Sequence, residues 1–463
     1  MGTGEGLTGR VVRPGDPGYD EARLDYNLRF DKVFPSAIVF CDTADDVART
    51  IAYARRRHRP VRVRSGRHSY EAYSIVDGGI VIDVSPMRRV WVDLRRGVAR
   101  IGAGIDLGTV YQRLWDAGHV TVPGGTCGGV GLAGLALGGG FGLIGRRYGL
   151  TCDAVVGLEM VDAEGARLHV DERSHASLLW ASRGGGGGNF GVVTEFTMRV
   201  QRVETVSIFR ILWPWDAIAD VIDGYQAWAN PQVLDDRLTP VLNLKARTGG
   251  SVAAFGQFLG PAARLYDLIR PLVAVAHPYE VEIQTMPYID AVRHFGGTAP
   301  GGSRFAMSRA EPGERFKNTS AYQYRLFDTQ AIATIKDHLA DTPSAACLIG
   351  LDTVGGAVAR RSDTATAFAH RRGVRASLQP QAYWDTDSEQ AAHVAWVDDL
   401  TRALGPFTHG GYVNYIDRAL RDWPQAYYGP NLDRLLAVKR AYDPCNVFDF
   451  PQGLGQLVRA REA

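Results

Sequence analysis

The sequence predicts a layered fold of mixed helices and strands, of the α/β or α+β class. Short apolar segments alternate with amphipathic helical segments over roughly the first hundred residues. Two glycine-rich stretches follow, at residues 124–142 and 183–194. From about Glu204 glycine loops become rarer, and longer helices alternate with strands. The length of 463 residues agrees with two or three domains at about 150 residues each.

Local patterns place the elements of the first part. Thr43 can cap a helix in which Val47, Ile51 and Ala54 recur at helical spacing. A second helix is expected at residues 107–117, ending at Gly118, and a hairpin at residues 155–161 and 166–170. Further strands are expected at residues 36–40, 61–64, 79–84, 98–101 and 192–200.

The remainder reads as a second domain and a return to the first. Helices are expected at residues 215–228 and 262–275, and strands at residues 252–259 and 281–284. We place one domain boundary near Val203. The chain is expected to return to the first domain near Gly405, because residues 410–415 again combine glycines with a strand-like sequence.

Composition excludes several classes of protein. Lys and Arg total 52 against 50 Asp and Glu, so nothing indicates a nucleic-acid partner. The N-terminal residues have no signal-peptide pattern and no stretch reaches ~18 apolar residues, so we expect no membrane partner and a cytoplasmic location. The five cysteines are scattered without CxxC, which argues against disulfides and a zinc site; no metal is expected. Cys41, Cys152, Cys347 and Cys445 are interpreted as small buried residues.

The loop at residues 64–69 has the composition of an anion-binding turn. Backbone N–H groups around Ser65, Gly66 and Ser69 can converge on a pyrophosphate, and Arg64 and Arg67 add positive charge. His68 then lies just beyond the phosphates. When this loop is taken alone, a surface turn with a solvated histidine is the favoured explanation.

Cys127 lies in a second loop of this kind, at residues 123–131. Glycine on both sides allows the backbone to approach a planar ring closely. The ordinary alternative is a buried free cysteine. The glycines of residues 184–188 also favour a loop that contacts a ligand, because a strand sequence follows at once. Residues 140–145 spell GxGxxG, but no predicted strand precedes them, so a Rossmann site is not expected. No P-loop pattern is present.

Residues 411–417 contribute possible proton chemistry. On a strand, Tyr412 and Asn414 share one face and Tyr415 lies on the other. A tyrosine near a cofactor can act as a general base once its pKa is lowered. The alternative is a core aromatic residue with a hydrogen-bonded hydroxyl.

Together these segments resemble the berberine bridge enzyme-like flavoproteins of the vanillyl-alcohol oxidase superfamily. The pieces occur in the family's order: residues 64–71, 124–131, 184–194, 412–417 and 442–448. The resemblance implies an α+β, two-domain vanillyl-alcohol oxidase-like fold. It divides the chain into an FAD-binding domain at residues 1–203, a substrate domain with an antiparallel sheet flanked by helices at residues 204–404, and a C-terminal segment of the FAD domain at residues 405–463.

The resemblance also implies bicovalent FAD. His68 would bond the 8α-methyl carbon of the flavin, and Cys127 its sixth carbon. Other residues would lie along the cofactor: Arg64, Ser65, Gly66, Arg67, Ser69, Gly128, Gly131, Gly138, Gly142, Gly191, Val193 and Asn414. Tyr415 is the first candidate for the general base and Tyr412 the second. A further catalytic tyrosine is in doubt because Pro380 stands where relatives often carry one, with Tyr383 a weak substitute.

The expected function is an FAD-linked oxidase. It would transfer hydride from an alcohol or hemiacetal carbon of a sugar or natural product to the flavin, with O2 as acceptor and H2O2 as product. Oxidative cyclisation or dehydrogenation of a secondary metabolite by the same flavin is the enzymatic alternative. A flavin-retaining binding protein without turnover is the non-enzymatic one. The sequence leaves the substrate and the oligomeric state open.

Overall fold

The computed structural model describes residues 6–304, 306 and 313–462 of the chain. Its N-terminal part contains a four-stranded sheet of order β1-β2-β4-β3, in which β2, β3 and β4 are parallel. Helix α2 (Ala44–Arg56) precedes β3, and a capping box between Thr43 and Asp46 begins it as expected. The strands of this sheet are β1 (Arg10–Val12), β2 (Ala37–Phe40), β3 (Val61–Arg64) and β4 (Ile80–Asp83).

A five-stranded antiparallel sheet of order β5-β6-β10-β8-β9 completes this part. Its strands are β5 (Val90–Asp93), β6 (Val98–Gly102), β8 (Val155–Val161), β9 (Arg167–Asp171) and β10 (Val192–Arg199). The expected hairpin is confirmed as β8 and β9. A short pair joins β7 (Val120–Thr121) to β11 (Gln201–Arg202). The helices here are α1 (Tyr19–Ala22), α3 (Leu107–Gly118), α4 (Leu132–Gly138), α5 (Gly145–Tyr148), α6 (Thr151–Ala154) and α7 (Ala176–Ala181).

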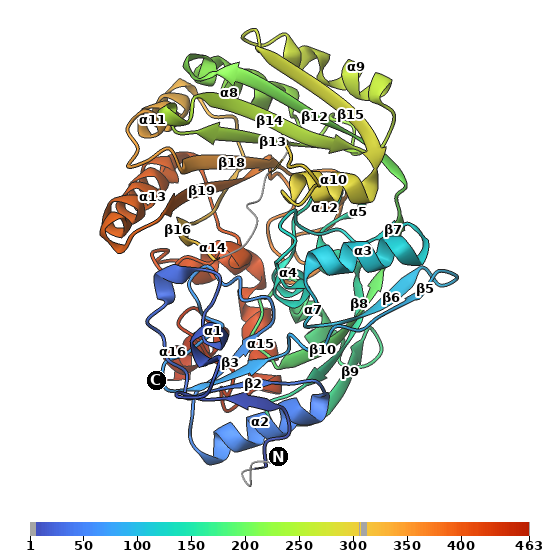
Figure 1. Cartoon of the computed structure of the whole chain (residues 1–463), viewed down its shortest axis with the longest axis vertical. Helices are drawn as coiled ribbons and strands as arrows, with labels where there is room; N and C mark the ends of the chain where they lie inside the picture. The colour runs from blue at the N-terminus through green and yellow to red at the C-terminus, as the bar shows by residue number, and fades with distance from the viewer. Residues whose placement is uncertain (1–5, 305, 307–312, 463) are drawn as a thin grey trace.

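The middle of the chain forms an eight-stranded sheet of order β15-β12-β14-β13-β18-β19-β16, with β17 also paired to β19. All of its pairings are antiparallel. Helices α8, α9, α11 and α13 cover its outer side (Figure 1). The strands are β12 (Thr205–Pro214), β13 (Leu238–Lys245), β14 (Ser251–Phe258), β15 (Glu280–Pro287), β16 (Arg315–Asn318), β17 (Ala321–Gln323), β18 (Cys347–Thr353) and β19 (Ala376–Trp384). The helices are α8 (Ile218–Trp228), α9 (Ala262–Val273), α10 (Tyr288–Phe295), α11 (Thr329–Ala340), α12 (Ala357–Arg360) and α13 (Gln390–Leu404).

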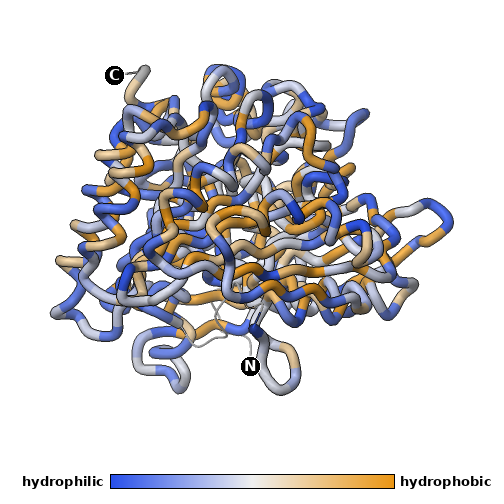
Figure 2. The backbone as a smooth tube through the Cα atoms, turned by 90° about the horizontal axis from the view of Figure 1, so that it is seen from above, coloured by the Kyte–Doolittle hydropathy of each residue, from blue (hydrophilic) through white to orange (hydrophobic). Residues whose placement is uncertain are grey.

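Two-residue alternation gives strands β18 and β19 of this sheet one apolar and one largely polar face. In β18, Ile349 and Leu351 pack under the covering helices, while Gly350 and Asp352 face the opposite way, into a cavity. The same alternation separates Leu378 from Gln379 in β19. The polar face is therefore turned toward the N-terminal part of the molecule. Figure 2 shows several largely hydrophobic stretches of the backbone running through the middle of the molecule.

The C-terminal segment packs with the N-terminal part, since its apolar side chains belong to the same hydrophobic core as those of the first two sheets. Its helices are α14 (Trp423–Tyr428), α15 (Leu432–Tyr442) and α16 (Leu454–Glu462). The α+β, two-domain fold is confirmed. The limits at residues 203 and 404 stay a prediction.

Helix α4 lies within the glycine-rich residues 124–142, because Leu132, Ala136 and Leu137 bury one of its sides. One local expectation was wrong. Residues 412–415 are not a strand: Val413–Tyr415 is a 3₁₀ turn in which the Tyr415 N–H donates to Tyr412 O at 2.8 Å. The turn brings the two tyrosine rings into edge-to-face contact at 4.8 Å, where a strand would separate them.

Candidate functional site

The His68 and Cys127 loops abut through backbone atoms. A β-carbon on Gly66 would lie 2.1 Å from Gly131 N, and one on Gly131 would lie 2.5 Å from Gly66 N. Only glycine allows this approach from both sides. The Ser65 hydroxyl also donates to Ala103 O at 2.7 Å, which fixes the first loop at the end of β6. The two sequence motifs therefore form one structural unit.

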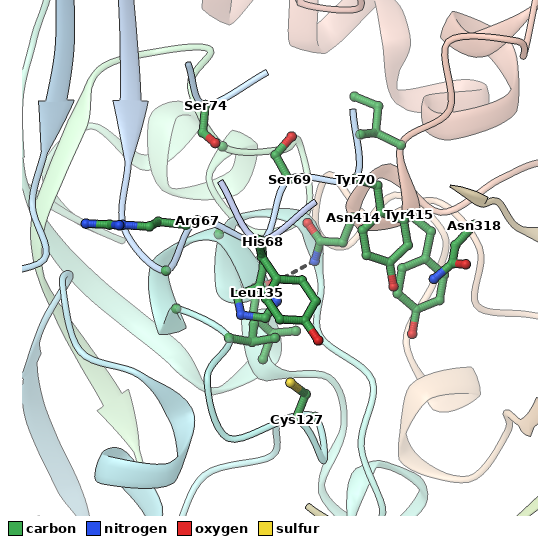
Figure 3. A pocket seen from close by; sticks show the side chains of 18 of the residues that line it. Arg67, His68, Ser69, Tyr70, Ser74, Cys127, Leu135, Asn318, Asn414 and Tyr415 are labelled. Atoms are coloured by element: carbon green, nitrogen blue, oxygen red, sulfur yellow. Dashed lines mark hydrogen bonds between the residues drawn. The ribbon is translucent and has the colours of Figure 1, made fainter. Parts of the chain in front are cut away.

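This unit lies against a cavity of about 720 Å³, which extends to the polar face of the eight-stranded sheet. His68 and Cys127 both line it, and Figure 3 shows their side chains directed into the same space. A cavity of this size matches those that bind cofactors and small molecules. The structure thus brings together two nucleophiles that lie 59 positions apart in the sequence (127 − 68).

Arg64 lines the cavity, but two carboxylates hold its side chain. Its Nε donates to Asp83 at 2.8 Å, Asp25 lies 3.8 Å away, and none of its side chain is exposed. Both carboxylates compensate this charge, and the contact of Arg64 with the cofactor stays a prediction. Arg67 lines the cavity, and desolvation, followed by the nearby charge of Arg64, lowers its pKa. Arg67 therefore carries the positive charge expected of this loop.

The predicted cofactor glycines divide into two groups. Gly66, Gly131 and Gly191 line the cavity, as do Ser65, Ser69, Val193 and Asn414. Gly128, Gly138 and Gly142 are not among the residues that line the cavity, and their contact with the cofactor stays a prediction. A β-carbon on Gly142 would lie 1.7 Å from Gly124 O, and one on Gly138 would meet the Asn414 side chain at 2.0 Å. These glycines allow close packing behind the wall, which sequence alone does not distinguish from ligand contact.

The glycine run at residues 184–188 contributes a further part of the wall through Gly186, Gly187 and Gly188. Gly186 and Gly188 have positive φ values of 88° and 73°, which explains glycine at both. The Gly186 N–H is occupied, because it donates to Leu137 O at 3.0 Å. The run shapes the wall, and at least one of its N–H groups is used within the protein.

Tyr412 and Asn414 form a hydrogen-bonded unit. The Tyr412 hydroxyl accepts from Gly140 N at 2.6 Å and from Asn414 Nδ2 at 2.8 Å, and the ring is 1% exposed. Asn414 Nδ2 also donates to Leu135 O at 3.0 Å. Burial raises the pKa of Tyr412. These contacts tie the C-terminal turn to the glycine-rich segment and its helix α4.

Tyr415 has a different setting. Its ring stacks on Tyr70 at 5.2 Å with an interplanar angle of 3°, and both rings line the cavity (Figure 3). Burial, followed by the hydroxyl of Tyr70 and the carboxylate of Asp352, raises the pKa of Tyr415 well above its usual value. The protein's own groups do not lower this pKa, because none of those that act on the Tyr415 hydroxyl is a cation. The role of Tyr415 as general base stays a prediction.

Asp352 was missed by sequence analysis. It lies near the end of β18, lines the cavity, and acts electrostatically on Tyr415. Burial raises the pKa of Asp352 to about 6. A single Asp in the chain's least predictable region carries no motif, and only the strand alternation of residues 347–353 indicates which way it points.

Amide and hydroxyl groups form the rest of this wall. Gln379 Nε2 donates to the Tyr70 hydroxyl at 2.7 Å, and the Tyr383 hydroxyl donates to Gln381 Oε1 at 2.8 Å. Asn318 Nδ2 donates to Tyr383 at 3.1 Å. Pro380 is tolerated between the two glutamines because it lies opposite the break between β16 and β17. Trp213 and Tyr322 are fully buried in the core.

The described residues contain no cluster of His, Cys, Asp and Glu suited to a metal ion. None of their helices combines the length and apolarity needed to span a bilayer. Cys41, Cys152 and Cys347 are buried as expected, whereas Cys445 is exposed, because it lies in the turn after α15.

Comparison with known proteins assigns the family. Residues 35–171 match the FAD binding domain family and residues 411–455 the "Berberine and berberine like" family. The chain is 40% identical to "Uncharacterized FAD-linked oxidoreductase YgaK" of Bacillus subtilis, over 98% of each chain. Among solved structures it resembles Physcomitrella patens BBE-like 1, with 30% identity, a TM-score of 0.89 and 96% of each chain covered. A chitooligosaccharide oxidase gives 25% identity and a TM-score of 0.85, with 96% of this chain and 97% of that chain covered.

The chain belongs to the berberine bridge enzyme-like FAD-linked oxidoreductases of the vanillyl-alcohol oxidase superfamily. The site fits the cofactor of that family: His68 and Cys127 line one cavity of about 720 Å³, and Arg67 adds positive charge to its wall. The resemblance found in the sequence motifs is confirmed.

Proposed function

We propose that this protein is an oxidase for the alcohol or hemiacetal carbon of a sugar or glycosylated natural product, with FAD held covalently by His68 and Cys127 and O2 as the final acceptor. When bound, the flavin accepts the hydride. The protein's own task is to bind the substrate, orient the C–H bond and remove the hydroxyl proton. The pairing of Tyr415 with Asp352 in one cavity is the observation that carries this proposal.

The pKa values assign the proton. Because the pKa of Tyr415 is raised, its hydroxyl is a poor base by itself at neutral pH. Asp352, with a pKa raised to about 6, is ionised at neutral pH and basic enough to accept a proton. We infer that Tyr415 binds the substrate hydroxyl and that the proton moves to the Asp352 carboxylate. Tyr412 is a positioning residue in this scheme, since its hydroxyl is occupied by Gly140 and Asn414.

The wall opposite the His68 loop supports a hydroxyl-rich substrate. Asn243, Gln379, Gln381 and Asn318 present amides to the cavity, and amides can both donate to and accept from sugar hydroxyls. The stacked pair of Tyr70 and Tyr415 adds an aromatic surface for the apolar side of a sugar ring. The name of the chitooligosaccharide oxidase agrees with this class of substrate.

Anaerobic mixing with glucose, cellobiose and chitobiose tests the proposal. We expect at least one to bleach the flavin absorbance, and Tyr415→Phe to slow that reduction by about 10²- to 10⁴-fold, the usual contribution of acid–base groups. In the wild type the reduction rate should fall as the pH drops through about 6, and Asp352→Asn should remove that dependence. Asp341→Asn, at an exposed aspartate after α11, is the matched control. A wild-type rate in Asp352→Asn would contradict the assigned proton path.

A further inference from the structure

A segment from the start of the chain passes over His68. The ring of Tyr26 stacks on the His68 imidazole with 4.3 Å between centroids and an interplanar angle of 17°. Stacking blocks one face of the imidazole and fixes its plane, while both nitrogens lie on the ring edge. Tyr26 lines the same cavity as His68 and Cys127, yet lies outside every motif that identified the cofactor site.

Two hydrogen bonds fix the backbone on either side of His68. The Tyr26 N–H donates to Arg67 O at 2.8 Å, and Asn27 Nδ2 donates to Tyr70 O at 2.8 Å. Arg67 has a left-handed φ of 62°, which costs a non-glycine residue energy and is held here by the first of these bonds. The segment thus controls the backbone that carries His68 as well as the orientation of its ring.

Glu314, from the middle of the chain, holds Tyr26 from the other side. The Glu314 N–H donates to Tyr26 O at 3.0 Å, and the Leu28 N–H donates to Glu314 O at 2.9 Å. The Tyr26 hydroxyl donates to Glu314 Oε2 at 3.2 Å. Burial, followed by the Glu314 charge, raises the pKa of Tyr26, so its hydroxyl stays protonated and remains a donor. The ring over His68 is therefore fixed at both its backbone and its hydroxyl.

We propose that Tyr26 is a positioning residue for covalent attachment of the flavin at His68, with Glu314 as its anchor. The inference rests on the two-point attachment proposed above. Bond formation joins an imidazole nitrogen to the 8α carbon and removes one hydrogen from each. These two protons and two electrons pass through the flavin to dioxygen, which leaves as hydrogen peroxide. An imidazole held in one plane reaches the carbon more often than a freely rotating one.

The test isolates the histidine bond in a Cys127→Ala background. Protein made in flavin-starved cells is incubated with FAD in air, denatured at intervals, and the fraction of chain carrying flavin mass is measured. Tyr26→Leu, which removes the ring, should attach flavin about three- to tenfold more slowly, the scale expected for loss of one aromatic pair. Tyr26→Phe keeps the ring and should attach it at nearly the parent rate. Tyr266→Leu, at an exposed tyrosine of α9, is the matched control.

The possible outcomes distinguish the role of Tyr26 from the covalent bond of the flavin to His68. Attachment in Tyr26→Leu at the parent rate overturns the role of Tyr26 and leaves the tether intact. Absence of attached flavin in the Cys127→Ala parent overturns the histidine bond and this inference with it. Restoration by Tyr26→Phe, with equal unfolding free energies for both variants, separates ring orientation from general stability. If Tyr26→Leu does not fold, Tyr26→Met serves instead and is expected to be slow as well.

Discussion

The contact between the two cofactor loops can be tested by adding one carbon atom. In Gly66→Ala the new β-carbon would lie 2.1 Å from Gly131 N and 2.6 Å from Gly131 Cα. Both are backbone atoms, so no side chain can rotate away, and the loops must separate. Overpacking of this kind costs typically ~1–3 kcal/mol. We therefore expect the free energy of unfolding to fall by about that amount, together with a lower content of attached flavin.

Denaturant unfolding and the flavin retained after denaturation measure the two effects. Gly405→Ala is the matched control, because Gly405 has φ −50° and a β-carbon there meets nothing within 4 Å. The control should unfold like the wild type and keep its flavin. If Gly66→Ala behaves like Gly405→Ala in both assays, the loops do not abut as described and the reasoning is refuted.

Three further changes test separate parts of the site. Burial raises the pKa of Asp352 to about 6, so the folded state binds this proton more tightly than the unfolded state, and the free energy of unfolding falls as the pH rises from about 4 to 6. In urea unfolding, Asp352→Asn should make this fall smaller by up to about 3 kcal/mol. An unchanged pH dependence of the unfolding free energy would contradict this reasoning. Arg64→Met leaves Asp25 and Asp83 buried without their shared cation and should lower the free energy of unfolding by about 3–5 kcal/mol. Arg67→Gly relieves the left-handed strain at this position and should lower FAD affinity without lowering stability. Equal unfolding free energies of the two variants would refute this distinction. Cys127→Ala should lower the flavin's reduction potential in a redox titration, because the sulfur bond withdraws charge, and an unchanged potential would count against this.

The sequence predicted well where a local signal has one physical meaning. Thr43 predicts the start of a helix because its side chain accepts a hydrogen bond from a backbone N–H. The hairpin of β8 and β9 is predicted by two apolar segments on either side of a turn. His68 and Cys127 were singled out because each lies in a short loop that contains glycine, and both line one cavity in the structure. These local structures are predictable because they depend on residues that are neighbours in the sequence.

The sequence failed where tertiary contacts decide. Arg64 looks like an anion ligand until Asp25 and Asp83 are seen to neutralise it. Gly142 looks like a cofactor contact until its packing against a backbone carbonyl is known. Asp352 belongs to no sequence motif. Its candidate role depends on its position in β18, where it lines the cavity and acts electrostatically on Tyr415.

The most direct test of the central claim is the mass of the denatured chain and of its peptides. The account predicts that washed, unfolded wild-type protein carries the mass of one FAD, shared between the peptides that contain His68 and Cys127. Each single variant, His68→Ala or Cys127→Ala, should keep the cofactor by its remaining bond, and the double variant should lose it. A wild-type chain of unmodified mass would contradict the account.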